Sequence, residues 1–230
     1  MDPVTDARAL VAARFPDALA AFLGDGIVSD RRTPTSDLDI VVVLAGPPAP
    51  YRESLHWRGW PAETFVHDTD SLERFFAADT ARRRPTLARL CTDSVVLAGS
   101  QETINQVRKR AGEVLAAEPA RPGQAELELS RYGISDLLDD LAGSTDQGES
   151  AVIAWDLWTA TAQLALVLAG HWLGTGKWLL RELRAADPVF AGRMTAALAD
   201  PAALPGLARE VLDHAGGPLW DGYRVAGNRA

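Results

Sequence analysis

The chain has 230 residues, of which 47% are hydrophobic and 23% charged, and its formal net charge is -8. This is ordinary globular composition, which excludes a disordered chain, and the length suits one large domain or two modest ones. The negative charge argues against a nucleic-acid partner, because such proteins usually need a basic face to displace counterions from phosphates.

The cysteine content and the apolar segments bear on where the protein works. Cys91 is the only cysteine, which excludes an intrachain disulfide and a Cys-rich zinc site and favours a reducing cytoplasm. The first ten residues, MDPVTDARAL, lack the basic start and apolar run of a signal peptide. Residues 151–173 are the most apolar later stretch, but Asp156, Gln163 and His171 interrupt it. We therefore expect a soluble protein with a buried helix there and no membrane partner.

Predicted helices and strands alternate in the first half of the chain. Thr5 or Asp6 is expected to cap a helix that runs to about Phe15 and ends at Pro16, which lacks a backbone donor. The short apolar run 18–23 is a strand candidate. Residues 38–44 (LDIVVVL) form a continuous, mostly β-branched run with turn residues on both sides. That pattern is typical of a central strand covered on both faces.

The alternation continues to about residue 117. A loop containing Trp57, Gly59 and Trp60 is expected to lead into a strand over 62–67 (AETFVH) and a helix that begins at Thr69 or Asp70. An edge strand over 94–98 and a helix over 101–117 follow. The pattern predicts an α/β arrangement.

The best linker in the chain is residues 118–123 (EPARPG), where two prolines and a glycine interrupt helical periodicity. The sequence after this linker shows no strand pattern, and three to five helices are expected there. Their breaks fall at GSTDQG, at LGTG, at Asp187-Pro188 and around Asp200-Pro201. This pattern indicates two domains, an α/β domain over 1–118 and a helical bundle over 124–230.

Two aspartates stand at alternate positions where a long loop enters the predicted central strand. Side chains two apart on a strand point to the same face, so Asp37 and Asp39 project together. Two like charges held so close repel each other, and a hard divalent cation such as Mg²⁺ relieves the repulsion.

Glu63 completes a three-carboxylate cluster if the strand over 62–67 pairs beside the central strand, because it shares a face with Phe65 and His67. Such a cluster holds two metals a few ångströms apart and supports in-line phosphoryl displacement. The alternative is that Ser36-Asp37-Leu38-Asp39 is only a helix cap or turn with solvated acids.

The block LGDGIVSDRRTPTSDLDIVVVL resembles the motif of small nucleotidyltransferases of the DNA polymerase beta superfamily. That motif is a Gly-Ser turn, a loop, and Ser-Asp-x-Asp entering a strand. PTSDLDIVVV matches its second half, and ETFVHD resembles the strand that supplies the third acid. The resemblance implies an α/β (α+β) N-terminal nucleotidyltransferase domain with a mixed sheet. It also implies that Asp37, Asp39 and Glu63 are catalytic metal ligands.

The first half of the motif departs from the family pattern. The resemblance places Gly24, Gly26 and Ser36 near the phosphates of a bound nucleotide, yet Gly26 stands where the family has a serine. An Asp25 carboxylate near a triphosphate adds repulsion unless it turns away, and Asp30 stands where a glycine is common. Gly26 still permits close backbone approach to phosphate.

The second half resembles the helical domain of aminoglycoside nucleotidyltransferases of the kanamycin type. The cues are RYGISDLLDDL, GESAVIAWDLW, HWLGTGKWLLREL and GGPLWDGY. The resemblance makes Glu149 the general base and Lys177 a phosphate ligand. The alternatives are that Glu149 only pairs with the positive end of a helix dipole and that Lys177 is a solvated lysine at a helix start.

Together these features predict a cytoplasmic enzyme that moves a nucleoside monophosphate, AMP from ATP with Mg²⁺, to a hydroxyl of a small molecule. An aminoglycoside-like acceptor suits the acidic chain. Two alternatives stay open. One is a protein-modifying, antitoxin-type nucleotidyltransferase, and the other is a non-catalytic binding protein that kept the acids and lost the phosphate turn.

Overall fold

The structure, a computed structural model, describes residues 2–30 and 32–226, apart from the side chain of Asp25. The chain divides into two compact units, Met1–Glu118 and Pro119–Ala230. The division falls in the proline-containing segment 118–123. Each unit is described by itself.

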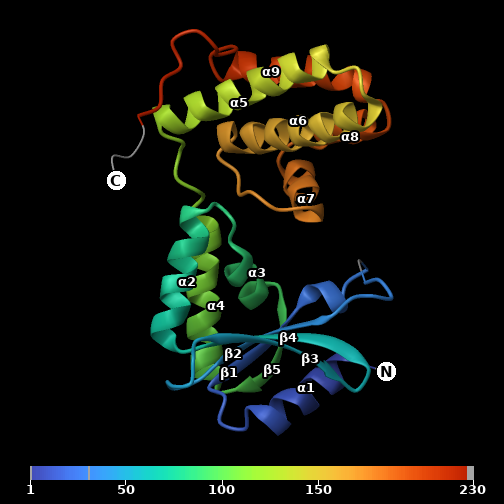
Figure 1. The fold of residues 1–230 in the computed structure, drawn as a ribbon. Helices are drawn as coiled ribbons and strands as arrows, with labels where there is room; N and C mark the ends of the chain where they lie inside the picture. The colour runs from blue at the N-terminus through green and yellow to red at the C-terminus, as the bar shows by residue number, and fades with distance from the viewer. Residues whose placement is uncertain (1, 31, 227–230) are drawn as a thin grey trace. The chain divides into compact units, whose positions relative to one another are not determined.

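The N-terminal unit is built on a five-stranded mixed sheet (Figure 1). The order across the sheet is β3-β4-β2-β1-β5. The β2–β4 pair is parallel and the other three pairs are antiparallel. The strands are β1 (Ala20–Gly24), β2 (Leu38–Val43), β3 (Tyr51–Trp57), β4 (Trp60–His67) and β5 (Ser94–Gly99). The mixed sheet is confirmed, and β2 is its central strand.

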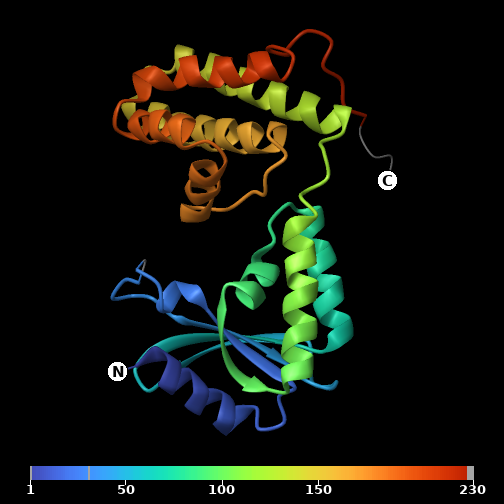
Figure 2. The same ribbon diagram turned by 180° about the vertical axis from the view of Figure 1, so that it is seen from behind.

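Helices cover both faces of this sheet (Figures 1 and 2). One face packs on α1 (Pro3–Arg14), and the other packs on α2 (Thr69–Ala81), α3 (Thr86–Thr92) and α4 (Gln101–Ala116). The side chains of β2 alternate between these two cores. Ile40 and Val42 point to the α1 side, and Val41 and Val43 point to the other. This alternation decides which face carries each polar residue of the strand.

The loop expected before β4 is instead part of a β-hairpin. Residues 51–57 (YRESLHW) form β3, the edge strand, which turns at Arg58 (φ 48°) and Gly59 (φ 86°) into β4. A two-residue turn with both φ values positive matches the twist of paired strands. The strand escaped prediction because its polar side chains suit an edge that faces solvent.

Two further details near the N-terminus and after α2 differ from the sequence-based expectations. The first helix is capped by Asp2, whose carboxylate accepts from the Thr5 amide at 2.9 Å. Asp6 is buried instead and accepts from Trp60 Nε1 at 3.1 Å, which ties α1 to the hairpin. The short helix α3 was not predicted, because seven residues are too few to show helical periodicity.

The C-terminal unit is helical, and its described residues form no strand. It contains α5 (Gln124–Gly143), α6 (Gln147–Leu168), α7 (Lys177–Ala186), α8 (Pro188–Ala199), a 3₁₀ turn (Pro201–Ala203) and α9 (Leu204–His214). The breaks between them fall at the four positions expected from the sequence. The helical C-terminal part is therefore confirmed.

Among the described residues, α6 is the one helix long and apolar enough to cross a membrane by length and composition. It is, however, the packing centre of the helical unit. Six of its residues, including Leu157, Trp158 and Leu166, are buried in a hydrophobic core shared with α5, α7, α8 and α9. Core helices of soluble proteins meet the same criterion, so the length and composition of α6 are weak evidence for a membrane-spanning helix.

Candidate metal centre

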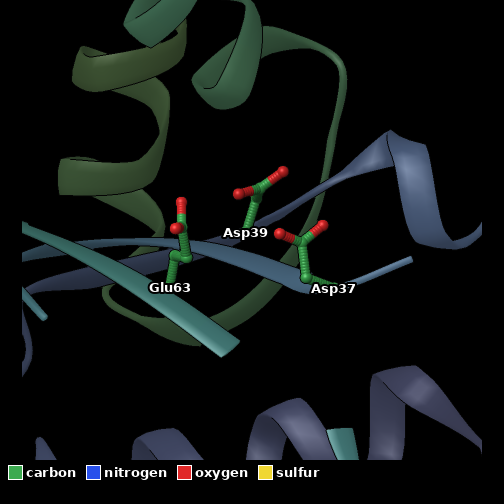
Figure 3. A group of neighbouring side chains, drawn as sticks. All are labelled: Asp37, Asp39 and Glu63. Atoms are coloured by element: carbon green, nitrogen blue, oxygen red, sulfur yellow. The ribbon is translucent and has the colours of Figure 1, made fainter. Parts of the chain in front are cut away.

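Three carboxylates from two neighbouring strands meet on one face of the sheet. Asp37 directly precedes β2, Asp39 is the second residue of β2, and Glu63 lies on β4. Because β2 and β4 are parallel, Asp39 and Glu63 are direct register partners. One oxygen of each acid lies within 4.8 Å of the others, and all three residues are half-buried. Figure 3 shows the three carboxylates side by side above the strands.

The cluster occupies the sheet face that carries Val41 and Phe65, on the side of α2, α3 and α4. Gly24 ends β1 beside it. A Cβ atom at Gly24 would lie 2.7 Å from Leu90 Cδ2 of α3 and 3.5 Å from Asp39 Cβ. The missing side chain therefore lets α3 pack closely over the end of β1 next to Asp39.

The edge strand β3 supplies two partners to Glu63. Ser54, its register partner, donates from Oγ to Glu63 Oε1 at 3.4 Å. The guanidinium of Arg52 forms an ion pair with Glu63 Oε2 and lies over the Phe65 ring, 5.0 Å from its centroid. Sequence reasoning missed both residues because it did not recognise β3. The available signal was the Arg58-Gly59 turn between two alternating segments.

The donor set fits a hard divalent cation. All three groups offer carboxylate oxygens, the ligands that Mg²⁺ and Mn²⁺ prefer. Asp39 and Glu63 come from paired strands, and Asp37 directly precedes the first of them. Their mutual repulsion gives a cation a further electrostatic reason to bind.

The residues expected near phosphate lie in and beside the loop between β1 and β2. Gly26 is exposed in a 3₁₀ turn (Asp25–Ile27), and a Cβ atom there would meet nothing within 4 Å. The Ser36 hydroxyl accepts from the Thr33 amide at 2.9 Å, which makes a local turn just before Asp37. The Asp25 side chain is outside the described residues. A nucleotide-binding role for Gly24, Gly26 and Ser36 stays a prediction.

Glu149 and Lys177 belong to the helical unit. Glu149 lies in the first turn of α6, where its amide donates to Asp146 Oδ1 at 2.9 Å, and its side chain is exposed. It lines an open, mainly apolar pocket with Gly148, Val152 and Ile153. Lys177 is the exposed first residue of α7. Their catalytic roles also stay predictions.

Two C-terminal segments that are far apart in the chain, RYGISDLLDDL and GGPLWDGY, lie side by side. Arg131 on α5 donates to the carbonyl of Gly217 at 2.7 Å, and the Leu219 amide donates to Ser135 Oγ at 3.0 Å. Tyr132 stacks on Trp220 and Tyr223, with ring centroids 5.4 and 4.1 Å away. These contacts give both cues a structural role, because they fasten the C-terminal segment to α5.

Comparison with known proteins finds similar chains among the solved structures. No family model and no curated protein matches the chain. Among solved structures, it is similar to a nucleotidyltransferase-like protein from Exiguobacterium sibiricum 255-15, with 10% sequence identity and a TM-score of 0.44. The match covers 94% of this chain and 73% of that one. At 10% identity the likeness is one of fold alone.

Proposed function

We propose that the protein is a metal-dependent nucleotidyltransferase that moves a nucleoside monophosphate, AMP from ATP, to a hydroxyl of a small molecule. The observation that carries the proposal is the carboxylate cluster. Asp39 and Glu63 lie on adjacent parallel strands, Asp37 directly precedes the first of these strands, and oxygens of the three acids lie within 4.8 Å of one another. Clusters of this kind hold the divalent cations that assist in-line displacement at phosphorus.

The three acids are the proposed metal ligands, and a bound Mg²⁺ would neutralise the triphosphate and polarise its α-phosphate. Gly24, Gly26 and Ser36 are the proposed phosphate-side residues. The open space around Gly26 supports that role, since backbone without a side chain allows phosphate to approach closely.

The proposed acceptor is a small molecule with a free hydroxyl and cationic groups, such as an aminoglycoside-like antibiotic. Its hydroxyl oxygen would form a bond to the α-phosphorus while the bond to the bridging oxygen breaks and pyrophosphate leaves. Glu149 is the proposed base that takes the hydroxyl proton, and Lys177 is a proposed phosphate ligand. The net charge of -8 supports a cationic acceptor.

We place this activity in the cytoplasm. The single cysteine supports that assignment: Cys91 is fully buried, and burial raises the pKa of its thiol to about 12. A buried, protonated thiol is inert as a nucleophile and forms no structural disulfide.

The proposal is tested by mass spectrometry of a panel of hydroxyl-bearing small molecules incubated with the protein, ATP and Mg²⁺. A mass gain equal to AMP on one compound supports it, and Asp39→Asn should abolish the gain. AMP found on a protein side chain instead would favour an antitoxin-type, protein-modifying enzyme.

A non-catalytic binding protein is the second candidate. It is favoured by the glycine at position 26 and by the pairing of Glu63 with Arg52, which partly neutralises the acids without a metal. Metal and nucleotide binding without transfer to any acceptor would identify this second function.

A further inference from the structure

Arg52 places a positive charge on one ligand of the candidate metal centre. Its guanidinium pairs with Glu63 Oε2, and the same carboxylate offers one oxygen to the three-acid cluster. We propose that Arg52 competes with a divalent cation for the Glu63 carboxylate: the ion pair opposes metal binding there, so Arg52 lowers the affinity of the centre for metal. This rests on the proposed function only in that a divalent cation binds the three acids.

The geometry holds Arg52 at this position. In the antiparallel β3–β4 pair, Arg52 faces Phe65 and Ser54 faces Glu63. Arg52 is thus the diagonal neighbour of Glu63 on one face, within reach of a long side chain. The Phe65 ring beneath the guanidinium adds a cation–π contact, with 5.0 Å to the centroid.

Both carboxylate oxygens of Glu63 are engaged by the edge strand. Oε1 accepts from Ser54 Oγ at 3.4 Å, and Oε2 pairs with Arg52. Asp37 and Asp39 precede or begin a different strand, β2. At Glu63, therefore, a protein cation and a metal ion would compete for the same carboxylate.

The ion pair between Arg52 and Glu63 is weak enough for a bound metal ion to outweigh it. The Arg52 side chain is 59% exposed and that of Glu63 is 26% exposed, so water screens the pair. Ion pairs of this exposure are weak, and a divalent cation shared by three carboxylates outweighs one of them. Removal of the guanidinium should strengthen metal binding by about twofold to fivefold, the range that such pairs support.

The test is Mn²⁺ titration of the full chain without nucleotide, followed by the electron paramagnetic resonance of free Mn²⁺. Arg52→Gln should bind Mn²⁺ about twofold to fivefold more tightly than wild type, and Arg52→Lys, which keeps the charge, should bind close to wild type. Arg52→Met keeps a long side chain against Phe65 and should match Arg52→Gln. It serves as the second variant if the glutamine variant does not melt cooperatively.

Arg14→Gln is the matched control. It also removes one positive charge and one ion pair to β3, since Arg14 Nη2 lies 3.0 Å from Glu53 Oε2. Its Mn²⁺ affinity should equal that of wild type, and an equal gain in this control would reduce the effect to net charge and overturn the inference. Unchanged or weaker binding in the Arg52 variants would also overturn it. If wild type itself binds no Mn²⁺, the proposed metal centre is wrong as well. If wild type binds Mn²⁺ and the Arg52 variants bind it no more tightly, only the inference about Arg52 is wrong.

Discussion

Asp39 and Glu63 face each other as register partners in the parallel ladder between β2 and β4. Parallel pairing in register keeps their Cα atoms adjacent and their side chains on the same face, whichever rotamers they adopt. The hydrogen bonds of the sheet therefore hold the two negatively charged side chains of Asp39 and Glu63 close together. Asp37, two residues before Asp39 in the sequence, adds the third.

We expect Asp39→Asn to lose most of the Mn²⁺ affinity of the chain, because it removes one anionic ligand from a three-carboxylate set. A titration of wild type and variant with Mn²⁺ measures this. Asp17→Asn changes an exposed acid outside the cluster and should bind like wild type. If wild type and Asp39→Asn bind Mn²⁺ equally, the metal assignment is wrong.

We expect Gly26→Ser to tighten ATP binding roughly fivefold to tenfold, since a hydroxyl donor to phosphate contributes on the order of 1 kcal/mol or more. The structure accommodates the change, because a Cβ atom at Gly26 meets nothing within 4 Å. Calorimetric titration with ATP in the presence of Mg²⁺ measures it. Gly46→Ser adds the same side chain in equally open space in another loop and serves as control. Unchanged ATP affinity in Gly26→Ser would mean that this turn does not hold phosphate.

We expect Glu149→Gln to lower turnover by about 10²-fold to 10⁴-fold, the usual contribution of a general base, with ATP and metal affinities retained. The AMP-transfer assay, once an acceptor is known, measures the rate. Asp156→Asn neutralises another exposed acid on the same helix and should stay active. A variant that keeps its activity and loses about 0.3–1 kcal/mol of stability would instead assign Glu149 to the helix dipole.

We expect His67 to make the stability of the chain depend on pH. His67 is buried against Phe75, and its Nδ1 atom has no hydrogen-bond partner among the described residues. Burial lowers the pKa of His67 below its ordinary value, and the charges of Asp68 and Asp79 oppose this only in part. As the pH falls below the ordinary histidine pKa of about 6.5, the unfolded chain takes up the proton first. The free energy of unfolding therefore decreases until the pH reaches the lower pKa that His67 has in the folded chain.

Urea unfolding at several pH values between 7 and 5 checks this expectation. His67→Leu should show a smaller loss of stability over that range than wild type. His56→Leu replaces an exposed histidine of β3 and should keep the wild-type dependence. Equal pH dependence in all three proteins would show that His67 does not titrate differently in the folded chain.

The sequence by itself determined the elements whose burial leaves a periodic or continuous apolar pattern. The β-branched run after Asp37 became the central strand β2, and the segment 118–123 became the division between the units. The breaks of the helical unit followed from proline and glycine, which act locally through the backbone. Asp37 and Asp39 were found in the same way, because the period of a strand fixes their common face.

Only the tertiary structure decided what the edge strand contributes. The polar residues of β3 carry no apolar signal, since one side of an edge strand faces solvent. Whether Glu63 meets the aspartates depends on the register and direction of the β2–β4 pairing, and Arg52 reaches Glu63 only through the hairpin that brings β3 beside β4. Strand order and register are set by contacts between segments distant in the chain, which no local pattern in a single sequence encodes.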